Sequence, residues 1–187
     1  FDGILSASPT PERKKNLSFT HAYYISPLAL VTPQSYPSID KAESFSGKRI
    51  ALIEGSAFDE YVKQTFPKAT IVYSKNETQG TLEMVLKGEA DAAIDNLAPM
   101  RYILENQGLD EKLKVALVLY SEDLSSFQYG LRNDEPLLLS SINKAIASYK
   151  TAEKKEIKER WEGLLLSPSD IKSKDPTPAL NLTPEEM

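Results

Sequence analysis

The sequence predicts an α/β fold, because short apolar strands alternate with helical patterns through the middle of the chain. The expected strands cover residues 48–54, 70–73, 90–94 and 112–119, and the expected helices cover residues 56–66, 80–87 and 97–106. Gly88 and Gly108 follow two of these helices, where a glycine supports the end of a helix. Strands separated by helices of about ten residues are typical of a parallel sheet with helices on its faces.

The N-terminal part carries a strong helix start after an expected strand and polar turn over residues 1–9. Thr10 can cap the helix, Pro11 occupies its first position and Glu12 follows in the first turn, which is the preferred order at a helix N-terminus. Further strands are expected at residues 17–20, 28–31 and 125–131, with a loop over residues 32–46.

The C-terminal part predicts two helices and then a linker. The first begins at residues 133–136 and places one apolar stripe on its surface, made of Leu138, Ile142, Ala145 and Tyr149. Thr151 caps the second helix, in which Ile157 and Trp161 pack together. Residues 167–181 are rich in Pro, Ser and Lys and are expected to be a linker, and residues 183–186 match a capping box.

Length and composition restrict the class of protein. The chain has 187 residues, 41% of them hydrophobic and 26% charged, a net charge of -5 and no cysteine. The length suits one domain or two small lobes. An acidic balance argues against a nucleic acid partner, and the lack of cysteine excludes thiol catalysis, disulfides and cysteine-based zinc sites. Because the chain opens at Phe1 without an initiator Met, we interpret it as a segment of a longer protein.

A strand, a glycine turn and a helix start meet at Gly55 and Ser56. Free N–H groups at a helix N-terminus favour an anionic or polar ligand. The alternative is that Gly55 and Ser56 only connect two elements, which is common for a single glycine turn.

Three ordered motifs resemble those of the bacterial family 3 solute-binding proteins. The first is residues 10–13 with residues 17–20 and Tyr23, the second is residues 46–51 with Gly55 and Ser56, and the third is residues 87–96. The resemblance covers residues 1 to about 163. It implies the type II periplasmic-binding architecture, also called a Venus flytrap, in which two α/β lobes joined by two crossing strands close on a ligand.

The resemblance also implies a division of the chain. Residues 1–33 are part of lobe 1, residues 34–117 are lobe 2, residues 118–166 return to lobe 1, and residues 167–187 are a linker and the start of a following helix. The family begins lobe 1 with elements that precede Phe1, so lobe 1 is expected to be incomplete at its N-terminus. Open strand edges in such a lobe favour pairing with another chain, which predicts a homodimer.

A closer likeness is to the periplasmic sensor modules of tandem-flytrap sensor histidine kinases. It rests on Asn96 with Leu97, on residues 127–136, and on the tail at residues 182–186, which resembles the join to a following flytrap. We therefore expect a periplasmic ligand-sensing domain of a membrane receptor, linked to a following flytrap or membrane-linked domain. The alternative is a free periplasmic amino-acid or solute-binding protein of an ABC transporter.

The resemblance implies six ligand-binding residues: Ser8, Arg13, Ser56, Ala57, Phe58 and Asn96. Arg13 stands where amino-acid binders hold the ligand carboxylate, which a planar guanidinium matches with two parallel bonds. Asn96 stands where they place an acid for the ligand ammonium. An amide lacks that charge but can bind a neutral or acidic ligand, and strand alternation turns Asp95 away from the cleft. The expected ligand is an amino acid or another carboxylate-bearing solute.

Catalysis and cofactors are not expected. His21 is the only histidine, so neither a Ser/His/Asp triad nor a multi-histidine metal site can include a second one. We place His21 near the rim of the cleft as an ordinary polar residue. Some relatives with this fold are dehydratases, but His21 and Asp95 are weak candidates for an acid or base. We therefore expect no enzyme activity, no metal and no cofactor in this segment.

Overall fold

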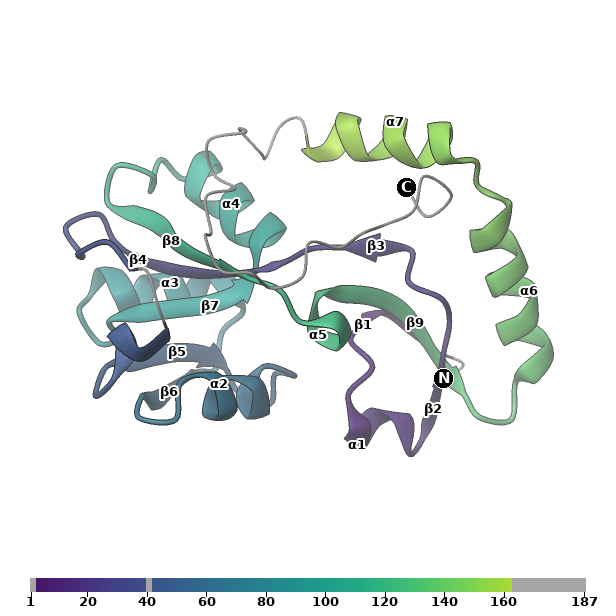
Figure 1. The fold of residues 1–187 in the computed structure, drawn as a ribbon, viewed down its shortest axis with the longest axis horizontal. Coiled ribbons are helices and arrows are strands. Elements are labelled where there is room, and N and C mark those ends of the chain that lie inside the picture. The colour runs from purple at the N-terminus through teal and green to yellow at the C-terminus, as the bar shows by residue number, and fades with distance from the viewer. Residues whose placement is uncertain (1–2, 40–41, 163–187) are drawn as a thin grey trace. The chain divides into compact units, whose positions relative to one another are not determined.

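The computed structural model describes residues 3–39 and 42–162 (Figure 1). The strands are β1 (Gly3–Ala7), β2 (Leu17–Phe19), β3 (Tyr24–Ile25), β4 (Leu28–Pro33), β5 (Arg49–Ile53), β6 (Thr70–Ser74), β7 (Ala92–Asn96), β8 (Leu113–Leu119) and β9 (Ser126–Arg132). The helices are α1 (Pro11–Lys14), a 3-10 helix η1 (Ala42–Phe45), α2 (Asp59–Thr65), α3 (Thr78–Leu86), α4 (Leu97–Asn106), α5 (Glu122–Ser125), α6 (Pro136–Ser148) and α7 (Thr151–Glu162).

The chain divides into two compact units. In the described residues, the first unit contains residues 3–25 and 122–162, and the second contains residues 26–39 and 42–121. The chain passes from the first unit to the second between residues 25 and 26 and returns between residues 121 and 122. The sequence instead predicts these two passages at 33/34 and 117/118. The difference arises because β4 and β8 pair with each other along their length and belong to one sheet.

The second unit is built on a five-stranded sheet with the order β6-β5-β7-β4-β8. β5 is parallel to β6 and to β7, as the alternation of strands and helices predicts, whereas β4 is antiparallel to both β7 and β8. The four strands of that alternation, β5, β6, β7 and β8, therefore all run in one direction, and β4, which precedes the alternation in the sequence, is the antiparallel strand between β7 and β8. Helices α3 and α4 contact each other, β4 and β7 (Figure 1).

The main core lies in this second unit. Leu30, Ile50, Leu52, Leu82 and Ile94 are each at most 1% exposed. β4, β5 and β7 are almost continuously apolar, as expected for strands that are covered on both faces. This buried sheet fixes the strand ends that carry the candidate ligand residues.

The first unit contains a small antiparallel sheet in which β9 is the central strand. β1 and β2 pair with opposite edges of β9, and β3 also pairs with β9. The register between β1 and β9 shifts between Ile4 and Ala7, where Ser6 has a positive φ of 55°. Among the described residues of this unit, the buried apolar side chains are Ala7, Leu124 and Leu131.

Helix α6 follows the predicted span but does not bury its apolar stripe. No residue of this helix is buried, and Leu138 and Tyr149 are 38% and 52% exposed. The structure describes the backbone of Trp161 but not its side chain, so the expected packing of Trp161 is not described. The linker and following helix start expected at 167–187, with the capping box at 183–186, lie outside the described residues.

Candidate functional site

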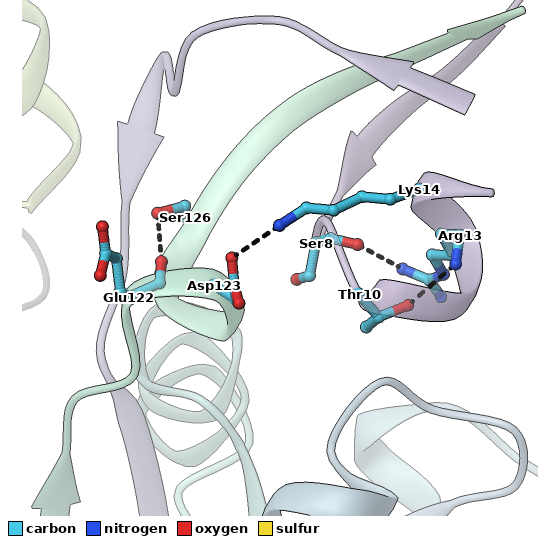
Figure 2. Close-up of polar contacts among 7 residues, drawn as sticks. All are labelled: Ser8, Thr10, Arg13, Lys14, Glu122, Asp123 and Ser126. Atoms are coloured by element: carbon cyan, nitrogen blue, oxygen red, sulfur yellow. Dashed lines mark hydrogen bonds and ion pairs between the residues drawn. The ribbon is translucent and has the colours of Figure 1, made fainter. Parts of the chain in front are cut away.

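In the first unit, the predicted ligand residues Ser8 and Arg13 lie together at the start of α1 (Figure 2). Thr10 caps the helix, with its Oγ1 accepting a hydrogen bond from the Arg13 N–H at 3.4 Å. The half-buried Arg13 donates from Nη1 to the carbonyl oxygen of the buried Ser8 at 3.2 Å. This bond orients the guanidinium, a planar group whose geometry matches that of a carboxylate.

A second set of contacts joins α1 to α5, where the chain has just returned to the first unit. Lys14 Nζ lies 3.3 Å from Asp123 Oδ1, and Ser126 Oγ donates to the carbonyl of Glu122 (Figure 2). Both charged side chains of the ion pair are about half exposed, so the pair contributes less than about 1 kcal/mol to stability. Its effect is to connect the Arg13 helix to the returning segment.

In the second unit, Ser56 lies in the turn after β5 and not in a helix. Gly55 has a positive φ of 73°, the Ser56 N–H donates to the Ile53 carbonyl at 3.1 Å, and α2 begins only at Asp59. The expected helix start at Ser56 is therefore wrong. Phe58 occupies the N-cap and makes no side-chain capping bond. The N-terminus of α2 therefore lies three residues beyond Ser56 and not at this turn.

The turn nevertheless presents a polar group without a partner. The Ser56 Oγ is buried and has no hydrogen-bond partner within the described residues. Ala57 is half-buried and Phe58 is buried. A buried hydroxyl that lacks a partner is unfavourable by about 1–3 kcal/mol, and a ligand group that bonded to it would remove this penalty.

The end of β7 carries Asp95 and Asn96, both buried. Asp95 accepts hydrogen bonds from Thr78 Oγ1 at 2.5 Å and from the Asn96 N–H at 2.7 Å. Burial raises the pKa of Asp95 above its usual range, although these two hydrogen bonds act in the opposite direction. Both carboxylate oxygens of Asp95 are thus used by hydrogen bonds within the second unit, one from Thr78 of α3 and one from the N–H of Asn96 in β7.

Asn96 is bonded to the segment that enters the second unit. Its Nδ2 donates to the Ser26 carbonyl at 3.2 Å, the Leu97 N–H donates to the Pro27 carbonyl at 2.7 Å, and the Ala98 N–H donates to Ser26 Oγ at 3.3 Å. The first turn of α4 is therefore hydrogen-bonded to residues 26–27, where the chain enters the second unit. Sequence reasoning missed Ser26 and Thr78, since both act through partners distant in the sequence.

The strand order explains why these two turns are candidates. The connection from β5 to β6 runs to one side of β5, and the connection from β6 to β7 returns to the other side. The carboxyl ends of β5 and β7 thus flank a topological switch point, which is where open α/β sheets bind ligands. Ser56 follows one of these strands and Asn96 ends the other.

His21 lies beside α6. In the first unit its N–H donates to Asn143 Oδ1 at 2.7 Å, and it borders an open groove along α6 with Pro136 and Leu139. Within the described ranges, no cluster of three or more His, Asp or Glu side chains could hold a metal ion.

The sequence pattern of the bacterial extracellular solute-binding proteins, family 3, matches residues 1–164. The virulence sensor protein BvgS of Bordetella bronchiseptica is 30% identical over 153 residues, which are 81% of this chain and 12% of that protein. The ABC transporter arginine-binding protein 1 of Escherichia coli is 25% identical over 173 residues, which are 86% of this chain and 66% of that protein. The chain therefore spans a small part of BvgS.

Two solved structures have the same fold. The periplasmic VFT2 domain of Bordetella pertussis BvgS has a TM-score of 0.71 at 26% identity, with 85% of this chain and 65% of that chain covered. An ancestral arginine-binding protein bound to arginine has a TM-score of 0.69 at 24% identity, with 82% and 68% covered. These matches confirm the expected Venus-flytrap fold.

No helix in the described part of the chain combines the length and the apolar character that a membrane crossing requires. The match to the family pattern extends over most of the chain, from residue 1 to residue 164, and so includes every element from β1 to α7. The chain therefore belongs to the bacterial extracellular solute-binding proteins of family 3.

Proposed function

We propose that this chain is the periplasmic ligand-sensing module of a membrane receptor of the sensor histidine kinase class. The observation that carries the proposal is the similarity to BvgS, in sequence over 153 residues and in the fold of its VFT2 domain. In this proposal the segment binds a solute and has no catalytic activity of its own. A following flytrap or membrane-linked domain receives the signal. Within the described residues, the outer edges of β1 and β2 pair with no further strand, which supports pairing of two receptor chains.

The proposed ligand is an amino acid or another carboxylate-bearing solute. Its contacts in the two units are the six residues Ser8, Arg13, Ser56, Ala57, Phe58 and Asn96. Arg13 binds the carboxylate, because the Ser8 carbonyl already fixes its guanidinium. The buried Ser56 hydroxyl and the Asn96 amide bind the polar groups of the ligand.

The register of the second sheet supports a signalling role. Leu28 lies opposite both Asn96 and Leu119, so the end of β7 lies beside the first crossing segment and one strand away from the second. Asn96 is also bonded to Ser26, the first residue of the second unit. A ligand that engages Asn96 therefore acts within a few residues of both links between the units and shifts the balance of their arrangements.

Thermal unfolding against a panel of amino acids and carboxylates tests the binding step. A ligand at a hundredfold excess over its dissociation constant should stabilise the wild-type chain by about 2.7 kcal/mol. Arg13→Ala should abolish this stabilisation. Lys15→Ala is a matched control, because Lys15 is an exposed neighbouring cation that pairs with Glu12. An Arg13→Ala variant that keeps the full shift would refute the carboxylate assignment.

The second candidate is a free solute-binding protein of an ABC transporter, which the similarity to the Escherichia coli arginine-binding protein favours. The full-length protein distinguishes the two functions. A transmembrane helix and a kinase domain after residue 187 are expected for the receptor, whereas a chain that ends without them, encoded beside a permease and an ATPase, would support the transporter.

A further inference from the structure

Helix α4, in the second unit, begins without the cap that its own sequence offers. Asn96 is the N-cap residue and has an extended backbone, but within the described residues its side chain makes no capping bond to the helix. The Asn96 side chain instead donates from Nδ2 to the Ser26 carbonyl at 3.2 Å. Asparagine is among the preferred N-cap residues, so here the start of the helix depends on acceptors from elsewhere in the chain.

The acceptors come from residues 26–27 of the same unit. The Leu97 N–H donates to the Pro27 carbonyl at 2.7 Å, and the Ala98 N–H donates to Ser26 Oγ at 3.3 Å. Ser26 therefore replaces Asn96 as the side chain that caps α4. The cap lies about 70 positions away in the sequence, where the chain enters the second unit.

The other two positions at the start of α4 need no further acceptor. A helix leaves its first four N–H groups without a partner in the helix, and in α4 these are the groups of residues 96–99. The Asn96 N–H donates to Asp95 Oδ1 at 2.7 Å, and Pro99 has no N–H. Residues 26 and 27 thus supply the acceptors that complete the helix start.

These contacts are enclosed by the second unit. Ser26, Asn96 and Leu97 are 2%, 6% and 5% exposed, and Leu28 pairs with Asn96 in the sheet. An N–H group that lost its acceptor there would not reach water while residues 26–27 stayed in place, and a buried polar group without a partner is unfavourable. The bonds should therefore break together, by a local opening that admits water, and not one at a time.

We propose that residues 26–27 and the start of α4 open and close as one cooperative element, whose closed form positions the Asn96 amide. Opening at residues 26–27 removes the acceptors of Leu97 and Ala98 and the carbonyl that holds Asn96 Nδ2. The conformation of the chain at its entry to the second unit is thereby coupled to the order of α4. In the proposed function Asn96 contacts the ligand, so Ser26 is a positioning residue for that contact.

Amide hydrogen exchange of the whole chain, followed residue by residue by NMR, tests the inference. Ser26→Ala removes the acceptor of the Ala98 N–H and keeps both carbonyl groups. Exchange should become at least about tenfold faster at both Leu97 and Ala98, and the Asn96 side-chain NH2 signals should move toward those of an exposed amide. Faster exchange at Ala98 alone would overturn the inference. An equal increase at Leu52, in the core of β5, would also overturn it, since α4 would then open only when the whole unit unfolds.

Pro27→Ala is a second variant, which keeps every acceptor in place. It releases the fixed φ of residue 27, so the open form gains conformational entropy, and exchange at Leu97 and Ala98 should become about two- to fivefold faster. Unchanged rates would refute the coupling.

Two matched controls separate this effect from general destabilisation. Ser74→Ala removes another buried serine hydroxyl of the second unit, and Pro33→Ala replaces the proline at the other end of β4. Neither should change the exchange rates at Leu97 and Ala98, and an increase in the controls as large as in the test variants would contradict the inference. No solute is added, so these outcomes are independent of the thermal-unfolding test of ligand binding.

Discussion

The hydrogen bond from Thr78 to Asp95 gives a prediction that follows directly from the structure. Thr78→Val keeps the shape of the side chain but removes the hydroxyl that donates to Asp95 at 2.5 Å. A hydrogen bond to a charged, buried acceptor is worth about 1.5–3 kcal/mol. We therefore expect the free energy of unfolding to fall by about 2 kcal/mol at a pH above the raised pKa of Asp95, where the carboxyl is ionised.

Urea unfolding followed by circular dichroism measures this loss. With a denaturant dependence of about 2 kcal/mol per molar urea, the midpoint should fall by about 1 M. Thr70→Val is the control, because Thr70 is an exposed threonine in β6 of the same unit. Its midpoint should change by the equivalent of less than about 0.5 kcal/mol.

The free energy of unfolding that Thr78→Val removes should also depend on pH. Burial raises the pKa of Asp95, so the folded protein retains this proton at pH values where the unfolded chain has released it. The contribution of Asp95 to stability therefore decreases as pH rises from the usual carboxyl range through the raised pKa. Thr78 stabilises the ionised form, so the penalty of Thr78→Val should shrink at about pH 4. An equal penalty at both pH values, or one no larger than that of Thr70→Val, would refute the assignment.

Two further substitutions test the second unit. Gly80→Ala should destabilise the protein even though alanine favours helices, because a Cβ at Gly80 would lie 2.5 Å from Ser74 Oγ and 2.6 Å from Asn76 Cβ; a higher melting temperature would contradict this. Asp91→Asn should lose about 1 kcal/mol near neutral pH, because Arg49 donates to Asp91 from its backbone N–H and its guanidinium. Since Arg49 lowers the pKa of Asp91, this loss should disappear as acid protonates the carboxyl, which urea unfolding at several pH values will measure.

Local patterns predicted the elements of the second unit well. Helix α4 occupies the predicted span of 97–106, and β6 and β8 differ from their predicted spans by one residue at one end. The predicted start of α2 at Ser56 was wrong because serine is a favoured helix-capping residue type. In the structure, the Ser56 N–H closes the turn after β5. Serine caps a helix by accepting a hydrogen bond at its Oγ, and the Ser56 Oγ has no such bond within the described residues.

The candidate site could be predicted only in part. The resemblance implied that Ser8 and Arg13 both bind the ligand, and the structure shows a hydrogen bond between the two residues. The bond from Thr78 to Asp95 and the bond from Asn96 to Ser26 join residues 17 and 70 positions apart. No local periodicity encodes such pairs, since they depend on how the sheet orders its strands.

The placement of β4 between β7 and β8 has a mechanical consequence. Ser26 precedes β4 and Ser121 follows β8, so both covalent links to the first unit leave from the same end of the sheet. Tension applied at Ser26 acts along β4. It therefore loads the hydrogen bonds from β4 to β7 and from β4 to β8 in shear, all at the same time. Tension on the edge strand β6 would instead open its bonds to β5 one after another, so a single-molecule pulling experiment should require more force through the links than through β6.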